Sequence, residues 1–352
     1  MNQIVFHLSP EMFQPSKRCL VEAGCLSAEV FQFPSGVRGL TLHNDRGQLV
    51  LLPYQGQQIW SAKMDGRELT MNSMFTQPIP TRDFLSTFGG FLVHCGGAAR
   101  GIPGQQANRP LHGEFPNAAY QSADLLLGED EHGAYIGLTG SYPYTVAFYD
   151  NFIAHPTVKL YAGATIFRVE MAVLNLKQTA MELSYLAHIN FRPVDGGRLV
   201  YSAICSPEHM QVNTELPAHL ELKPGYEEFV DDLANHPEKH LLFHSNQKYD
   251  PEVVIRIDYL ADENGWARQL QVHPNGAADL VRHRPAELGR GIRWISRTPD
   301  QDAIGFEPAT GADGKNFIII AAGASFHCTM EVGTLSPGEV AVEEQRAKHP
   351  SG

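Results

Sequence analysis

The stretch FRVEMAV, residues 167–173, has a large apolar side chain at every second position, with Arg, Glu and Ala between them. This period is typical of a β-strand that has one face buried and one face in water. The stretch VVIRI, residues 253–257, alternates in a similar way, and FIII, residues 317–320, is apolar throughout. An uninterrupted apolar run is typical of a strand at the centre of a sheet, covered on both faces. Strands of both kinds favour an all-β fold.

Turn residues extend this prediction to the rest of the chain. The sequence contains 32 glycines and 23 prolines, which interrupt it about every ten residues and leave little room for helices. Hairpin signals of the Asp-Gly or Asn-Gly type recur between apolar segments, at residues 44–47, 65–66, 195–197, 263–265 and 313–314. Many strands joined by short turns make a large antiparallel sandwich or barrel. The best helical candidate is residues 224–240, where apolar side chains recur at helical spacing.

The chain reads as one large folding unit. It contains no internal repeat and no linker that would divide it in two. We predict an N-terminal docking arm over residues 1–35, the sandwich domain over residues 36–340 and a C-terminal tail over residues 341–352.

Composition narrows the class of partner. The 352 residues carry a net charge of −12, which repels nucleic acid and anionic lipid surfaces. The sequence has neither a secretory leader at its start nor an apolar run long enough to span a bilayer, so no membrane partner is expected. Its five cysteines are scattered without a C-x-x-C pair, which fits the reducing cytoplasm.

Three residues stand out as candidates for chemistry. His112 lies in the string RPLHGEFPN, residues 109–117, where the glycine after it allows close approach of backbone or ligand. Strand alternation places His188 and Asn190 on one face, as two polar groups that point together. Glu307 is a carboxylate among apolar neighbours, which must be paired or have a raised pKa. A hydrogen-bonded core histidine and a salt bridge are the plain alternatives for these residues.

The order of these strings resembles the aldose 1-epimerase (galactose mutarotase-like) family. The resemblance is closest to a poorly characterised branch of that family, once classed as a domain of unknown function. It covers roughly residues 40 to 325, and the strings that carry it are TFGGFLVHCG at 87–96, LHGE at 111–114, residues 168–175, HINF at 188–191 and FEPAT at 306–310. The resemblance implies a large antiparallel β-supersandwich.

The resemblance also implies a mechanism. In such mutarotases an acid protonates the ring oxygen of a sugar while a base removes the proton of the anomeric hydroxyl, so that the ring opens and recloses as the other anomer. Carried over to this sequence, His188 is the acid, Glu307 the base and His112 the residue that orients the sugar. This chemistry needs no metal and no cofactor. The expected partner is a monosaccharide or sugar derivative, and a homodimer is left open.

Two departures from the family pattern concern recognition of the sugar. Glu114 replaces the usual second glycine after the histidine, and His94-Cys95 replaces an Asn-Arg pair found in many mutarotases. Both changes fall where sugar hydroxyls would be bound, so we expect a sugar other than plain galactose or glucose. The side chains expected to bind it are Arg82, His94, Arg109, Asn190 and Asp258.

Other functions stay open at this stage. The same fold could serve a sugar-binding sensor without catalysis, since fold alone does not establish activity. An opened sugar beside a base can also lose its C2 proton, which would make the protein an isomerase or epimerase at another carbon. A polysaccharide lyase or glycosidase is a third possibility. A glycosidase would use two carboxylates across the scissile bond, and only Glu307 stands in a motif, while a second carboxylate such as Glu114 is unplaced. A cupin-like metal enzyme would need clustered histidines, which the sequence lacks.

Overall fold

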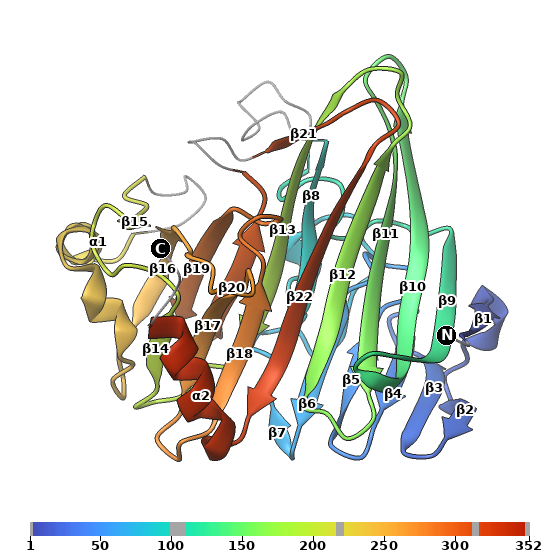
Figure 1. The fold of residues 1–352 in the computed structure, drawn as a ribbon, viewed down its shortest axis with the longest axis horizontal. Coiled ribbons are helices and arrows are strands. Elements are labelled where there is room, and N and C mark those ends of the chain that lie inside the picture. Colours follow the sequence, from blue (N-terminus) through green and yellow to red (C-terminus); the bar gives the residue numbers. More distant parts are fainter. Residues whose placement is uncertain (1–2, 99–109, 216–221, 312–316, 349–352) are drawn as a thin grey trace.

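Two antiparallel sheets stacked as layers form the protein (Figure 1). The computed structural model describes residues 3–98, 110–215, 222–311 and 317–348. We call the sheet of nine strands sheet A and the sheet of 13 strands sheet B. Every pairing between their named strands is antiparallel. The predicted all-β class and large antiparallel sandwich are confirmed.

Sheet A runs from edge to edge in the order β1, β9, β10, β11, β12, β22, β18, β17, β14. Its strands, in chain order, are β1 Ile4–Leu8, β9 Ser122–Asp130, β10 Gly133–Val146, β11 Asp150–Tyr161, β12 Ile166–Asn175, β14 Arg198–Tyr201, β17 Ala267–Val272, β18 Ala278–His283 and β22 Ser325–Leu335.

Sheet B runs in the order β15, β16, β19, β20, β13, β8, β6, β5, β4, β3, β2, with β21 beside β13 and β7 beside β6. Its strands, in chain order, are β2 Arg18–Ala23, β3 Leu26–Gln32, β4 Arg38–His43, β5 Gly47–Leu51, β6 Ile59–Met64, β7 Arg67–Glu68, β8 Leu92–Ala98, β13 Met181–Phe191, β15 Met210–Val212, β16 Tyr249–Ile257, β19 Arg290–Arg297, β20 Asp302–Ala309 and β21 Ile318–Ile320.

Helices are few in the described part of the chain. The two α-helices are α1 Tyr226–Asn235 and α2 Pro337–Lys348, and the three short 3₁₀ helices are η1 Pro10–Met12, η2 Leu85–Thr87 and η3 Pro237–Leu241. The helix predicted within residues 224–240 is confirmed by α1, which buries Tyr226, Val230 and Leu233. No helix among the described residues is long and apolar enough to cross a membrane.

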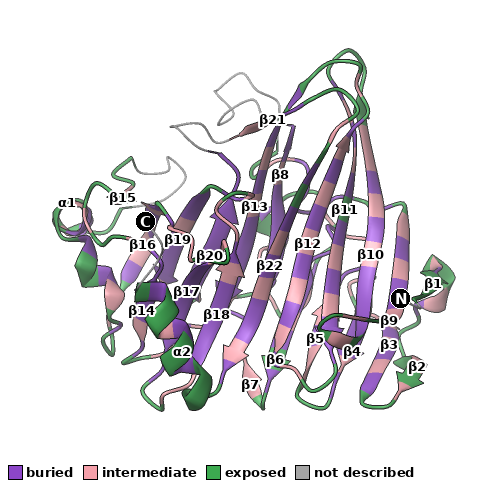
Figure 2. Ribbon diagram, in the orientation of Figure 1, coloured by how far each residue is buried: buried purple, intermediate pink, exposed green. Residues whose placement is uncertain are grey.

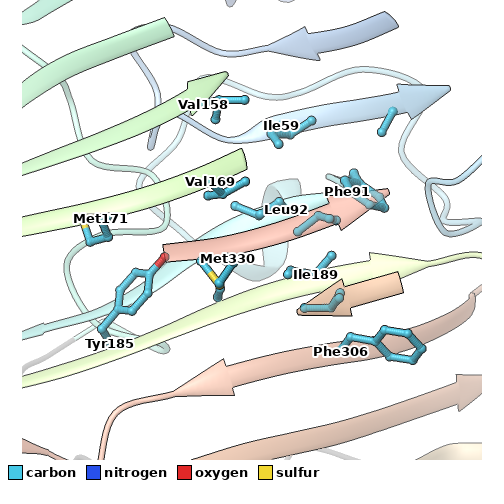
Figure 3. Close-up of a cluster of buried hydrophobic side chains, with 14 of the residues drawn as sticks. Ile59, Phe91, Leu92, Val158, Val169, Met171, Tyr185, Ile189, Phe306 and Met330 are labelled. Carbon is cyan, nitrogen blue, oxygen red and sulfur yellow. The ribbon is translucent and has the colours of Figure 1, made fainter. Parts of the chain in front are cut away.

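The main core lies between the two sheets. In β12 the residues Phe167, Val169, Met171 and Val173 are buried, while the residues between them are partly exposed, as the alternation predicts. Figure 2 shows these alternating bands along β12 and β10. Apolar side chains of both sheets meet in this layer, among them those labelled in Figure 3. The inner faces of the sheets are therefore occupied by core.

Some sequence predictions differ from the structure. The run at 317–320 is expected at a sheet centre, and this is wrong: within the described part of the chain β21 pairs only with β13, and Ile319 is 62% exposed. Apolar composition alone does not reveal whether a strand has two neighbours. Residues 341–348, predicted as part of a tail, belong to α2, which packs Val340 and Ala347 against sheet A. The segment predicted as a docking arm supplies β1 to sheet A and β2 and β3 to sheet B.

Candidate active site

His188 and Glu307 come from neighbouring strands of sheet B. β13 pairs with β20 so that Ile189 lies opposite Phe306, and this register sets His188 opposite Glu307. Ile189 and Phe306 point into the core between the sheets. Because side chains alternate along a strand, His188 and Glu307 point to the opposite side, which we call the outer face of sheet B.

The two side chains are close together and buried. Nδ1 of His188 lies 3.4 Å from Oε1 of Glu307, and the residues are 4% and 3% exposed. Oε1 of Glu307 has no hydrogen-bond partner among the described residues. A buried polar atom of this kind calls for an explanation, and a bound ligand that donates a hydrogen bond is one.

Asn190 fixes the protonation of the His188 ring. Its side-chain nitrogen donates to the carbonyl oxygen of Gly90 at 3.0 Å, so its Oδ1 is the atom that faces His188. This oxygen lies 2.6 Å from Nδ1 of His188 and can only accept, so Nδ1 carries the hydrogen. The other ring nitrogen, Nε2, is then the atom that can take up a proton from a ligand or give one to it.

His112 reaches the pair from a strained turn. Its backbone has a φ of 60°, which is uncommon for a residue with a side chain and is found at functional sites. The turn is held because Gly96 N donates to the carbonyl of His112 at 2.7 Å, and Glu114 N donates to the carbonyl of Gly96 at 2.7 Å. A Cβ on Gly113 would lie 2.3 Å from Gly96 O, so the glycine after the histidine is required by this close approach. The His112 ring lies 5.8 Å from the His188 ring.

Aromatic rings surround the two histidines. Phe84 lies 4.3 Å from the His112 ring, Phe88 lies 5.1 Å from the His188 ring and Trp294 lies 5.3 Å from it, all between ring centroids. Sequence reasoning missed these three rings. Trp294 could have been found from its place in β19. Ile292 lies opposite Glu307 in the pairing of β19 with β20, and the alternation of side chains puts Trp294 on the same face as Ile292.

The low polarity of this site shifts the titration of all three groups. Burial raises the pKa of Glu307 well above its usual value, although the positive charge of Arg293 opposes the shift. Burial lowers the pKa of His188 to about 3, assisted by His112 and opposed by the hydrogen bond to Asn190. His112 keeps an exposed face, but the protein atoms packed around the rest of its ring lower its pKa to about 4. In the empty site each group therefore favours its neutral form.

Gly305 makes room for the Glu307 carboxylate. A Cβ added to Gly305 would lie 2.2 Å from Oε1 of Glu307, so the carboxylate occupies the space that any other residue would fill. Sequence reasoning missed this residue too. Because residues 305 and 307 share one face of β20, a glycine two positions before the glutamate was the available signal.

Gly305→Ala is expected to move the Glu307 carboxylate and reduce any activity of the site by about tenfold or more, since a shift of about 1 Å can cost 10²-fold. Gly338→Ala is the matched control, because a Cβ at Gly338 meets no atom within 4 Å. Rates measured for both folded variants check the prediction. Equal rates for wild type and Gly305→Ala would show that the position of the carboxylate does not matter.

The other residues predicted to bind the sugar lie in different places. Asn190 is at the site through its bond to His188. Arg82 is exposed and donates to the backbone carbonyls of Asn117 at 3.0 Å and Glu114 at 3.3 Å, so it braces the segment after His112. Arg109 lies outside the described residues.

His94 and Asp258 are not beside the pair. In the pairing of β8 with β13, His94 lies opposite Ala187, so it points into the core and contacts Tyr185 OH at 2.8 Å. Its expected contact with a ligand on the outer face is wrong, because the strand register assigns it to the inner face. Asp258 is exposed and follows β16, two strands or about 10 Å from the strand of Glu307.

Comparisons with solved structures agree with this architecture. A candidate aldose 1-epimerase from Klebsiella pneumoniae is 16% identical and superposes with a TM-score of 0.79, covering 100% of this chain and 96% of its own. A galactose mutarotase-like protein from Clostridium acetobutylicum is 12% identical with a TM-score of 0.60, covering 89% and 100%. A galactose mutarotase-like protein from Lactobacillus casei is 14% identical with a TM-score of 0.52, covering 84% and 100%. Such low identities establish the fold alone.

Sequence comparison gives the family. No curated protein matches the chain. A family profile described as a domain of unknown function, DUF4432, matches residues 34–331, which is most of the chain. The resemblance found in the sequence to a poorly characterised branch of the mutarotase-like proteins is thereby confirmed. The chain belongs to the DUF4432 family and has the galactose mutarotase-like fold.

Proposed function

We propose that this protein is an aldose 1-epimerase-like enzyme that interconverts the anomers of a monosaccharide or sugar derivative. The observation that carries the proposal is the buried pair of His188 and Glu307, 3.4 Å apart, with the ring of His112 beside it. Anomer exchange needs one acid and one base around a single carbon atom, and this pair supplies both within the reach of one sugar.

The number of protons that His188 and Glu307 hold together decides whether they can act as acid and base. With a lowered pKa at His188 and a raised pKa at Glu307, the pair holds one dissociable proton at every pH between these two pKa values. Sugar hydroxyls that donate to Oε1 of Glu307 would stabilise the carboxylate. The proton then belongs on Nε2 of His188, which gives the acid and the base that the reaction requires.

The surroundings also suit a sugar. The rings of Phe84, Phe88 and Trp294 offer apolar surface on which the C–H face of a pyranose can pack. The carboxylate, the imidazoles and Asn190 offer a small number of polar groups that converge between these rings, as in small-molecule sites generally.

The deciding experiment measures anomer exchange directly. Freshly dissolved single anomers of neutral, deoxy, keto and acidic sugars are followed by NMR in D₂O, with the spontaneous rate subtracted. Accelerated exchange of at least one sugar is expected. Tight binding without acceleration would instead favour a sensor, and deuterium entering at C2 would favour an isomerase acting at that carbon.

The pH dependence of the rate follows from the two shifted groups. Below the pKa of His188, about 3, a second proton removes the base, and above the raised pKa of Glu307 the loss of the first proton removes the acid. We expect kcat/KM to be flat between these two pKa values, with its acidic limb below about pH 4 and its other limb at the raised pKa of Glu307. A profile that rises with a midpoint near the ordinary histidine value of about 6.5 would contradict this assignment.

We also place the protein in the cytoplasm. All five cysteines are free, and Cys19, Cys25 and Cys205 are exposed. Exposed thiols without partners are best preserved in a reducing compartment.

A further inference from the structure

Arg293 lies directly behind the site, on the inner face of sheet B. Its residue is fully buried, with 0% of its surface exposed. The guanidinium donates through Nε to Tyr201 OH at 2.9 Å, through Nη1 to Gly305 O at 2.6 Å and through Nη2 to Gln269 Oε1 at 3.1 Å. It also lies 3.6 Å from the centre of the Phe306 ring.

These contacts leave the positive charge of Arg293 without a directly bound anion among the described residues. A guanidinium keeps its charge inside proteins, and its partners Tyr201, Gly305 and Gln269 contribute only neutral oxygens. Buried charges are normally paired because removing a charge from water is costly. A negative charge close by would therefore lower the cost of burying this residue.

The carboxylate of Glu307 can supply this negative charge. Nη1 of Arg293 binds the carbonyl of Gly305, and Oε1 of Glu307 lies over the same glycine on the other side of the sheet. The guanidinium and the carboxylate are thus separated by one glycine peptide. Burial disfavours the Glu307 carboxylate, and Arg293 is the positive charge that opposes this effect.

We propose that Arg293 is a positioning residue that stabilises the ionised form of Glu307 through the sheet and so maintains it as a base. This inference rests on the proposed function, which gives Glu307 that role. A direct ion pair would occupy the carboxylate oxygens and weaken them as proton acceptors. Placing the positive charge behind Gly305 leaves Oε1 of Glu307, which has no hydrogen-bond partner among the described residues, open to the substrate.

Other ionisable groups around Glu307 do not replace Arg293. His188 on β13 and His112 in its turn have lowered pKa values and favour their neutral forms. Cys95 on β8 is a buried thiol whose pKa is raised. Glu252 on β16, which accepts a hydrogen bond from Trp294 Nε1 at 2.6 Å, raises the pKa of Glu307 further.

Infrared spectroscopy of the whole protein tests the proposal without an activity assay. The C=O band of the protonated Glu307 carboxyl is identified by its absence in Glu307→Gln and followed against pH. In Arg293→Met we expect the midpoint at which this band disappears to move upward by about one to two pH units. Arg293→Lys keeps the charge and should move it by less. Arg268→Met, which removes a buried arginine from sheet A, should leave it unchanged.

The outcomes separate this inference from the proposed function. An unchanged midpoint in a folded Arg293→Met protein would overturn the inference, even if the wild type catalyses anomer exchange. A shifted midpoint would support the coupling, even if no sugar tested is turned over. Should Arg293→Met not fold, Arg293→Gln keeps an amide that can donate to Gly305 O, and its midpoint decides in the same way.

Discussion

Glu307→Gln is expected to lower the rate of anomer exchange by about 10²–10⁴ while sugar binding largely survives. Glutamine keeps the size of the side chain and can hydrogen-bond to a sugar hydroxyl, but it cannot accept the proton. NMR exchange rates and a separate binding titration check the two halves of this prediction. Equal rates for variant and wild type would remove Glu307 from the mechanism.

The same substitution is expected to stabilise the fold at neutral pH. Because the folded protein raises the pKa of Glu307, the stability associated with this group is complete below its ordinary value and is lost as pH rises through the raised value. Glutamine carries no charge and avoids that loss, so we expect a gain of about 1–2 kcal/mol at pH 7–8, which shrinks toward pH 4. Thermal unfolding at several pH values measures the effect.

Glu343→Gln is a matched control, in which the free energy of unfolding is expected to change in the opposite direction. Glu343 is also buried, but its carboxylate accepts from Arg268 at 2.5 Å and from Arg346 at 3.0 Å in the ion-pair network under α2. Removing this partner should lower the free energy of unfolding by about 1–3 kcal/mol and leave the rate of the folded protein unchanged. A buried glutamate that supports the fold is thereby distinguished from one that weakens it.

His188→Asn is expected to reduce the rate by a similar factor of about 10²–10⁴. The asparagine amide can donate to Asn190 Oδ1 in place of Nδ1, so the local hydrogen bond is kept while the proton-carrying Nε2 is lost. The rate and its pH profile are the measurements, and the flat region between the two limbs of the profile should not survive.

His283→Asn provides the comparison for His188→Asn. His283 is fully buried in sheet A, and burial lowers its pKa to about 3, as it does for His188. It lies in a different sheet and contacts Tyr259 rather than the site. The folded variant should retain the wild-type rate. A similar loss in both variants would mean that His188→Asn acts through the packing of the protein and not through proton transfer.

Local patterns in the sequence predicted the class of fold well. The period of two in β12 indicates which side chains face the core, and glycine-containing turns indicate where strands end. The apolar run of β21 was misjudged because the number of neighbouring strands depends on distant parts of the chain. Similarly, the turn at 195–197 predicts a hairpin, yet β13 and β14 belong to different sheets.

The sequence indicated the site only in part. His112, His188 and Glu307 were found because short strings around them resemble a family. His94 was misplaced because its face is set by the pairing of β8 with β13, which no local pattern reveals. Gly305 and Arg293 were missed for the same reason, since their importance lies in contacts across the strand and through the sheet.

The strand order of sheet B has a consequence for how the protein is made. The strands from β2 to β8 are neighbours in chain order, whereas β13 lies between β8 and the late strand β20. On a ribosome the early hairpins can pair as they emerge, because their contacts are local. The edge of β13 that pairs with β20, and with it His188, stays unpaired until synthesis has passed residue 309, the end of β20. The acid–base pair is therefore assembled only when more than four-fifths of the polypeptide exists, and a nascent chain would acquire its chemistry last.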